Sequence, residues 1–380
     1  MTSFSQKINR RFSSGPRLLA LALLAALALP ACQNNGSGDP APGLIQPAGP
    51  PPAYAPDFDP QMLAVIEQFM GFGTPPLPTL SPRQARMAPS VPDAVNALLR
   101  KNNRAARPFN VAVSQQLLPG GITPQSAPDG LLVRIYKPMN AAAGPLPVVV
   151  YYHGGGWVIG SLDVYEPGAK ALAEKAGAIV VSVDYRLAPE NKFPAAHEDA
   201  YAAYKWVHDN AASIGGNPAK VAVAGESAGG NMAAGVCILA RERGYALPVH
   251  QLMVYPVANN DLNTASYMQY ANAVPLNKPG VVYFTTLYFN TPADGDNRLI
   301  SLTDVADLRG LPSATIVAAE IDPLQTEGQQ LRDKLTQAGV KVQYQLYPGT
   351  THEFFGTHDV VPKANDAQDF AAAQLRAAFQ

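Results

Sequence analysis

The sequence predicts an α/β fold with a mostly parallel central sheet flanked by helices. From about residue 131, short apolar runs alternate with helix-like segments, the pattern of strand–helix–strand units. Several runs are continuously apolar, as expected of strands that are buried on both faces. The expected strands are 131–136, 148–152, 179–183, 221–224, 252–254, 315–319 and 342–346. The expected helices are 169–176, 194–210, 230–243 and 327–338, the last two closed by Gly244 and Gly339.

The first 31 residues have the pattern of an export signal. Basic residues precede an apolar run of Leu and Ala at residues 18–29, which is too short to anchor the chain across a bilayer. The following Leu29-Pro30-Ala31-Cys32 resembles a bacterial lipoprotein cleavage site. We therefore expect lipidation at Cys32 and an exported protein, periplasmic or on the cell surface and favouring the outer membrane, that contacts the membrane only through this anchor. An ordinary cleaved signal is the alternative.

Residues 32–57 are expected to form a proline-rich tether between the anchor and the folded domain. Seven of the 25 residues from 33 to 57 are proline, and such a segment buries too little apolar surface to fold by itself. The folded domain is expected at 58–380. Its first part, 58–110, contains helix-forming patterns that precede any strand, and 257–312 interrupts the alternation with many aromatic residues. We expect these two parts to form a helical cap, although 257–312 could be a plain surface excursion.

The overall composition limits the range of partners. The chain has 380 residues, 47% of them hydrophobic, and a formal net charge of −1. This allows a large core and provides no basic surface for nucleic acid. The two cysteines, Cys32 and Cys237, cannot make a disulfide framework or a zinc site, and no metal-binding motif is present. We therefore expect no metal, no cofactor and no nucleic-acid partner. The sequence does not indicate an oligomeric state.

Residues 221–231 contain a pattern that carries chemistry. An apolar strand leads into Gly225-Glu226-Ser227-Ala228-Gly229, and a helix-compatible run follows. This G-x-S-x-G pattern predicts a tight turn that presents the Ser227 hydroxyl at the carboxyl edge of the sheet. The glycines lack a Cβ, so the helix can start close to the strand. Since short matches to this pattern also arise by chance, the prediction needs further residues.

A serine nucleophile needs a base, an acid that orients the base, and donors for an oxyanion. Three glycines, 154–156, follow an earlier strand, where backbone N–H groups can face a substrate without side-chain obstruction. Asp322 stands just beyond a later strand, and His352 follows the last strand. The order Ser227, Asp322, His352 is that of α/β-hydrolases and differs from both major serine-protease families.

Taken together, these motifs resemble the bacterial branch of the hormone-sensitive lipase family of esterases. The resemblance covers roughly residues 58–380. The motifs that carry it are His153-Gly154-Gly155-Gly156-Trp157, Asp184-Tyr185-Arg186-Leu187-Ala188-Pro189-Glu190, Gly225-Glu226-Ser227-Ala228-Gly229-Gly230, Asp322-Pro323-Leu324 and His352. It implies the α/β-hydrolase fold, Ser227 as nucleophile, His352 as general base and acid, and Asp322 as its partner. It also implies an oxyanion hole made by the N–H groups of Gly155, Gly156 and Ala228. By the same resemblance, His153 and residues 184–190 support the glycine loop.

Two positions depart from the family pattern. Glu353 follows the predicted catalytic histidine, where family members usually have glycine, and Thr326-Glu327-Gly328 replaces the usual Asp-Glu-Gly. Neither change touches the predicted triad. Glu353 could alter access to His352 or the charge around it, and therefore the pH optimum or the substrate preference.

The activity expected from these residues is hydrolysis of small-molecule carboxylic esters, with short to medium acyl chains, through an acyl-enzyme on Ser227. Two alternatives remain at this point. An amidase or peptidase could use the same triad, and a non-catalytic ligand-binding module could share the fold. A comparison of hydrolysis rates on ester and anilide substrates would distinguish an amidase from an esterase. A missing triad residue would indicate the ligand-binding module.

Overall fold

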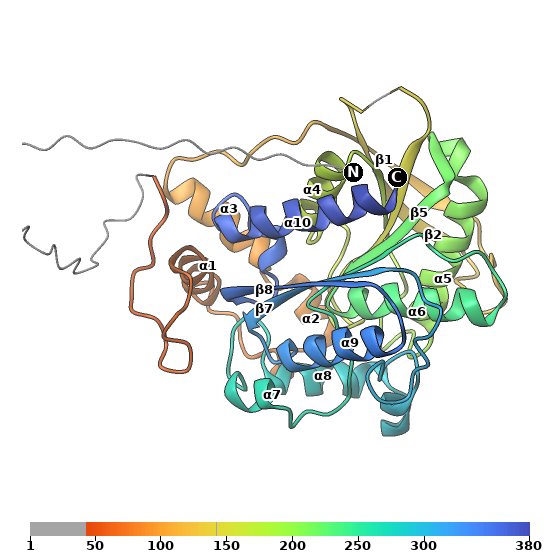
Figure 1. Ribbon diagram of the computed structural model, residues 1–380. Helices are drawn as coiled ribbons and strands as arrows, with labels where there is room; N and C mark the ends of the chain where they lie inside the picture. Colours follow the sequence, from red (N-terminus) through yellow and green to blue (C-terminus); the bar gives the residue numbers. More distant parts are fainter. Residues whose placement is uncertain (1–42, 142) are drawn as a thin grey trace, which may run out of the picture. The chain divides into compact units, whose positions relative to one another are not determined.

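The computed structural model describes residues 43–141 and 143–380. Within them an eight-stranded sheet has the order β1-β2-β4-β3-β5-β6-β7-β8 (Figure 1). Strand β2 pairs antiparallel with β1 and β4, and all other neighbouring strands are parallel. The bounds are β1 (Val111–Leu118), β2 (Leu131–Pro138), β3 (Leu146–Tyr152), β4 (Ile179–Val183), β5 (Gly216–Glu226), β6 (Gln251–Val254), β7 (Ala314–Ile321) and β8 (Val342–Thr351). The seven predicted strands and the mostly parallel sheet are therefore confirmed.

Helices cover both faces of this sheet. One face packs against α1, α3, α4 and α10, and the other packs against α5, α6, α8 and α9 (Figure 1). The helices are α1 (Pro60–Met70), α2 (Pro82–Met87), α3 (Val91–Lys101), α4 (Glu166–Ala176), α5 (Ala195–Asn210), α6 (Ala228–Glu242), α7 (Ala265–Gln269), α8 (Lys278–Tyr288), α9 (Gln325–Gln337) and α10 (Pro362–Ala378). None of these helices is long and apolar enough to cross a membrane.

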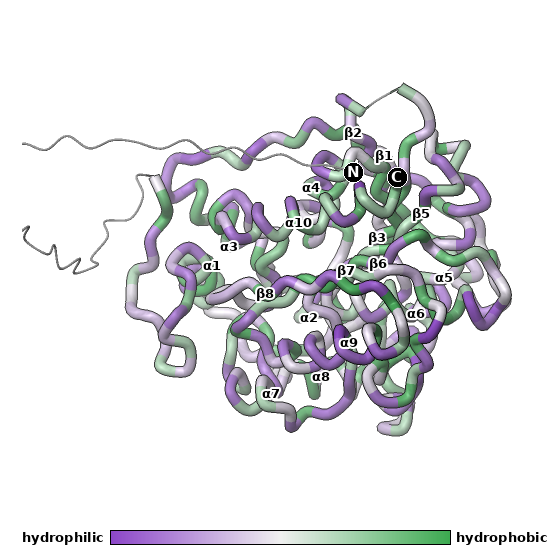
Figure 2. The backbone as a smooth tube through the Cα atoms, viewed as in Figure 1, coloured by the Kyte–Doolittle hydropathy of each residue, from purple (hydrophilic) through white to green (hydrophobic). Residues whose placement is uncertain are grey.

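The alternation of side chains along the central strands produces two cores. In β3, Val148, Val150 and Tyr152 belong to the core below α5 and α6. Val149 and Tyr151 belong to the core on the opposite face, because successive residues of a strand point to opposite sides. Figure 2 shows how hydrophobic the strands at the centre of the sheet are.

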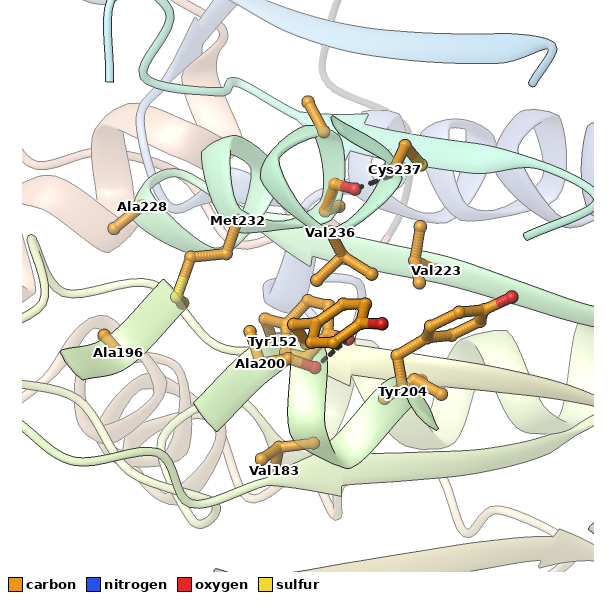
Figure 3. Close-up of a cluster of buried hydrophobic side chains, with 14 of the residues drawn as sticks. Tyr152, Val183, Ala196, Ala200, Tyr204, Val223, Ala228, Met232, Val236 and Cys237 are labelled. Carbon is orange, nitrogen blue, oxygen red and sulfur yellow. Dashed lines mark hydrogen bonds between the residues drawn. The ribbon is translucent and has the colours of Figure 1, made fainter. Parts of the chain in front are cut away.

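Figure 3 shows the first of these cores around the helix that begins after β5. The Tyr152 hydroxyl donates a hydrogen bond to the carbonyl of Ala200 at 2.9 Å, so its polar end is satisfied inside an apolar layer. Cys237 is fully buried beside it as a small core residue, and its Sγ contacts the Ala233 carbonyl. The packing fixes the position of α6 on the sheet, and with it the turn that joins β5 to α6.

The predicted tether is too long at its C-terminal end. Residues 43–57 are packed on the domain: Ile45 and Ala55 are buried in the same core as α1. The backbone N–H groups of Ala48 and Gly49 donate to the Glu67 carboxylate of α1, at 2.6 and 2.8 Å. Proline lacks an N–H group, so this segment has few donors to satisfy, and one carboxylate serves two of them. Residues 1–42, which include the predicted signal and Cys32, lie outside the described residues.

The sequence did not predict β1 or α10. Strand β1 is an edge strand that pairs only with β2, and most of its residues are exposed, so it lacks the apolar run that identifies a buried strand. Helix α10 does carry a helical pattern, since Ala364, Ala367, Ala371 and Leu375 are all buried on one side. Small alanine side chains make that pattern weak in the sequence.

Candidate active site

Ser227 lies at the sharp turn between β5 and α6, as the G-x-S-x-G pattern predicts. Its backbone has φ 56° and ψ −118°, a conformation that costs free energy for a residue with a side chain. A Cβ on Gly229 would lie 2.0 Å from the Tyr152 carbonyl oxygen, and one on Gly225 would lie 2.2 Å from the Gly229 carbonyl oxygen. Only glycine fits at these two positions, so they allow the turn that presents Ser227.

The structure brings Ser227, His352 and Asp322 together. His352 Nε2 lies 2.9 Å from Ser227 Oγ, and His352 Nδ1 lies 2.6 Å from Asp322 Oδ2. Asp322 follows β7 and also accepts a hydrogen bond from the Leu324 N–H at 2.9 Å. With Nδ1–H donating to Asp322, Nε2 is left to accept the Ser227 proton. All three side chains are buried, so this arrangement is shielded from bulk solvent.

The electrostatics of His352 result from two opposing effects. Burial alone would lower its pKa, because it disfavours the charged imidazolium. The Asp322 carboxylate opposes burial by its charge and its hydrogen bond, with smaller contributions from Glu353 and Glu226. The net result is a pKa raised above 6.5. This arrangement favours a histidine that gains a proton during a reaction.

The glycine loop after β3 lines the same pocket as Ser227 and His352. Gly155 and Gly156 have φ of 103° and 58°, which glycine adopts readily. The Gly155 carbonyl accepts from the N–H groups of Val158 and Ile159, at 3.1 and 2.9 Å, and this turn fixes the loop. Among the described residues, the N–H groups of Gly155, Gly156 and Ala228 donate to no protein acceptor. The three predicted donors are thus available to an oxyanion.

Residues 184–190 hold this loop, as the family resemblance implies. The Tyr185 ring stacks on His153 with centroids 4.2 Å apart, and its hydroxyl donates to the His153 carbonyl at 2.8 Å. The Ala188 N–H donates to the Trp157 carbonyl at 2.8 Å. Burial lowers the pKa of His153 to about 4, so its ring is neutral and serves as packing rather than as an acid or base.

Arg86, on α2, connects the cap to this loop, and no sequence motif points to it. Its guanidinium donates to the carbonyls of Val158 and Ala188, at 2.8 and 2.7 Å. It also makes a bidentate pair with Glu190, at 2.9 and 2.6 Å. One cap residue therefore contacts both the chain just after the glycine loop and residues 184–190, which support that loop.

A pocket of about 880 Å³ opens above Ser227 and His352. Both predicted cap segments line it. The first contributes Phe69, Met70, Leu77 and Val91, and the second contributes Leu262, Leu276, Phe284 and Phe289. The ring of Phe284 on α8 lies directly over the glycine loop, because a Cβ on Gly156 would be 2.2 Å from Phe284 Cγ. The pocket is therefore mostly apolar, and Ser227 and His352 are among the polar residues that line it.

Sequence reasoning also missed the tyrosines around the site. Glu226 is buried between the hydroxyls of Tyr151 and Tyr255, which both donate to its carboxylate. The Tyr255 ring lies 4.5 Å from the His352 ring, centroid to centroid. These residues come from the ends of separate strands, and no local motif brings them together.

Comparisons with known proteins agree with this fold and site. The family described as α/β hydrolase fold matches residues 149–356. Carboxylesterase NlhH of Mycobacterium tuberculosis is 44% identical over 66% of this chain and 80% of its own length. Ethyl acetate hydrolase of Pseudomonas putida is 36% identical over 62% of this chain and 75% of its own length.

Solved structures give the same result. A thermostable esterase from Pseudomonas putida has a TM-score of 0.77 and 30% identity, covering 86% of this chain and 99% of that one. A hyperthermophilic esterase from Pyrobaculum calidifontis has a TM-score of 0.71 and 36% identity, covering 78% of this chain and 94% of that one.

The chain belongs to the α/β-hydrolase family, in the group that resembles hormone-sensitive lipase. With carboxylesterases and esterases as its relatives, it is a serine hydrolase of carboxylic esters.

Proposed function

We propose that Ser227 forms the acyl-enzyme in this ester hydrolysis, with His352 as general base and acid and Asp322 as its orienting partner. The observation that carries the proposal is the continuous hydrogen-bonded line Ser227–His352–Asp322, with distances of 2.9 and 2.6 Å. Nucleophile, base and orienting acid lie within hydrogen-bond reach of one another, which is the geometry that nucleophilic acyl transfer requires.

In this mechanism, His352 Nε2 takes the Ser227 proton while Oγ attacks the ester carbonyl carbon. The carbonyl oxygen becomes an oxyanion and accepts hydrogen bonds from the N–H groups of Gly155, Gly156 and Ala228. Imidazolium then gives its proton to the leaving alcohol oxygen, and the acyl-enzyme remains. His352 next takes a proton from water as the resulting hydroxide attacks the acyl carbon. The imidazolium then returns that proton to Ser227 Oγ as the bond to the acyl carbon breaks, which releases the acid and restores Ser227.

Ser227→Ala tests this assignment. We expect ester hydrolysis to fall by about 10⁴-fold or more with the fold unchanged, because no other group can form the acyl-enzyme. Rates are measured on protein purified in parallel from a host that lacks other esterases, and folding is checked by thermal unfolding. A variant that keeps a tenth of the wild-type rate would overturn the assignment of Ser227.

We further propose short to medium acyl chains as substrates. Cap side chains line much of the pocket of about 880 Å³, and Phe284 covers the glycine loop. A profile of kcat/KM over esters of increasing acyl length measures the limit. A matched anilide series tests the amidase alternative, for which the described residues offer no specific support.

We also propose that the protein is an exported lipoprotein attached through Cys32. The pattern of residues 1–32 supports this, and the spacer is shorter than expected, since residues from 43 onward pack on the domain. An extended chain covers at most about 3.6 Å per residue, so residues 33–42 can span about 35 Å. Wild type should pellet with membranes and carry radiolabelled fatty acid, and Cys32→Ser should lose the label. An unlabelled wild type would leave a plain exported esterase.

A further inference from the structure

Glu353 occupies a backbone position that suits glycine. It directly follows His352 and has φ 68°, in the left-handed region where a residue with a Cβ is disfavoured. The structure therefore explains why family members usually have glycine here. A glutamate at this place therefore makes the fold less stable than a glycine would, unless its side chain forms compensating interactions.

A hydrogen bond from Tyr165 holds the carboxylate of Glu353, the residue after His352, in one place. The hydroxyl of Tyr165 donates to its Oε1 at 2.5 Å. Tyr165 stands at the start of α4, stacks on His153 with centroids 5.7 Å apart, and lies against Gly154. Glu353, Tyr165 and His352 all line the substrate pocket. The carboxylate is therefore anchored to the same part of the fold that carries the glycine loop.

Carboxyl groups from three elements act on the imidazole of His352, and Asp322 contacts it directly. Asp322 comes from the end of β7, Glu226 from the end of β5, and Glu353 from the turn after β8. Each of them raises the pKa of His352. The other titratable groups packed here are the tyrosines, of which Tyr255 contacts the imidazole ring and Tyr151 and Tyr165 bind the carboxylates.

The two glutamates differ in how readily they ionise. Glu226 is 2% exposed, and burial raises its pKa to about 7, against the two tyrosine hydroxyls that lower it. Burial also raises the pKa of Glu353, while His352 and Tyr165 lower it. Glu353 is more exposed than Glu226 and borders the open pocket. Access to the pocket therefore favours the charged form of Glu353 over that of the fully enclosed Glu226.

We propose that Glu353 is a positioning residue for ester hydrolysis: fixed by Tyr165, its carboxylate stabilises the imidazolium that His352 forms when Ser227 attacks. The inference rests on the roles proposed above for Ser227 and His352. It adds to Asp322 a second anionic partner, which the usual glycine does not provide. The interaction strengthens in the transition state, so it acts on kcat more than on KM.

Glu353→Gln is the direct test, because it keeps the size of the side chain and an acceptor for Tyr165 and removes only the charge. With an uncharged aryl ester at constant ionic strength, kcat should fall by about tenfold, with KM changed by less than about twofold. Loss of the negative charge lowers the pKa of His352, so the acid limb of kcat/KM should move to lower pH by about 0.5–1 unit.

Two further variants separate charge from structure. Glu353→Gly also removes the charge but suits the left-handed backbone, so it should repeat the kinetic change and unfold at a higher temperature than Glu353→Gln. Tyr165→Phe keeps the charge and frees the carboxylate, so it should lower kcat less than Glu353→Gln does. A melting temperature near that of wild type shows that each variant is folded.

The outcomes are distinct. A wild-type acid limb in both Glu353 variants would overturn the inference, even if kcat were lower, because the effect would then be structural. Wild-type kcat in Glu353→Gly would overturn it too. Either result leaves the proposed function standing as long as Ser227→Ala is inactive, whereas an active Ser227→Ala variant would remove the proposed function itself.

Discussion

Gly155→Ala tests the glycine loop through a single methyl group. A Cβ at this position would lie 2.2 Å from the Ile159 carbonyl oxygen and 2.5 Å from its carbon, whereas real Cβ atoms essentially never come within 3.0 Å. The clash is with backbone, so no side chain can rotate away from it. The φ of 103° adds strain, because L-residues rarely adopt it.

The size of the effect follows from the displacement. Backbone atoms must separate by about 0.8 Å, which disturbs the turn closed by the Val158 and Ile159 N–H groups. A shift of this order moves the donors away from the oxyanion. A misplacement of about 1 Å costs on the order of 100-fold, and removal of one oxyanion donor costs about 10²–10³-fold in kcat. We expect kcat to fall about 100-fold, equivalent to about 3 kcal/mol, and KM to change little.

The assay is steady-state hydrolysis of a short aryl ester, with Gly177→Ala as the matched control. Gly177, after α4, has φ 63°, and no atom lies within 4 Å of the place that an alanine methyl group would take. Alanine there carries the backbone strain without the clash. The control should lose about 1 kcal/mol of stability and no activity. A Gly155→Ala variant with kcat within about threefold of wild type, or a loss confined to KM, would refute the role of the loop.

Two further predictions concern the pocket and stability. Phe284→Ala removes the ring over Gly156, so kcat/KM for long-chain esters relative to short ones should rise by about tenfold. An unchanged ratio across the acyl series would contradict the assigned position of Phe284 in the acyl pocket. Glu226 has a pKa of about 7 in the fold against about 4.3 unfolded, so its ionisation destabilises the fold as pH rises between these values. The free energy of unfolding of Glu226→Gln, taken relative to that of wild type, should therefore be higher at pH 8 than at pH 5 by about 3 kcal/mol, as measured by urea unfolding. An equal difference at both pH values would show that Glu226 ionises freely in the fold.

The sequence predicted those parts of the fold whose signals are local. The buried strands were visible because strands covered on both faces have to be apolar throughout. Strand β1 was not, since an edge strand with one exposed face has no such requirement. The tether was placed too far into the chain for a related reason. Its prolines indicate an extended segment, but Ile45 and Ala55 bury their side chains against α1, a contact that composition cannot reveal.

The same distinction applies to the site. Ser227, Asp322, His352 and the glycine loop each belong to a short motif, and the chain order of the motifs predicts how they meet. Arg86, Tyr165 and Phe284 belong to none. Each acts across the fold, and its partner is far away in sequence: Arg86 binds Glu190, and Tyr165 binds Glu353. Such pairs depend on how the cap lies on the sheet. Glu353 was visible only as a departure from a family pattern, and its φ of 68° gives the physical reason for the glycine that is usual there.

The proposed transition state carries a negative and a positive charge, and different parts of the chain stabilise each of them. In the proposed mechanism the negative oxyanion meets the N–H groups of Gly155, Gly156 and Ala228, with the positive end of the α6 dipole behind Ala228. The positive imidazolium is hydrogen-bonded to Asp322 and, in the proposal above, is also stabilised by the charge of Glu353. Changes at the two parts should therefore differ in pH dependence. Gly155→Ala lowers kcat without moving the acid limb, because it leaves the charges around His352 in place. Glu353→Gln moves the acid limb, because the charge it removes acts on His352 before any substrate is bound.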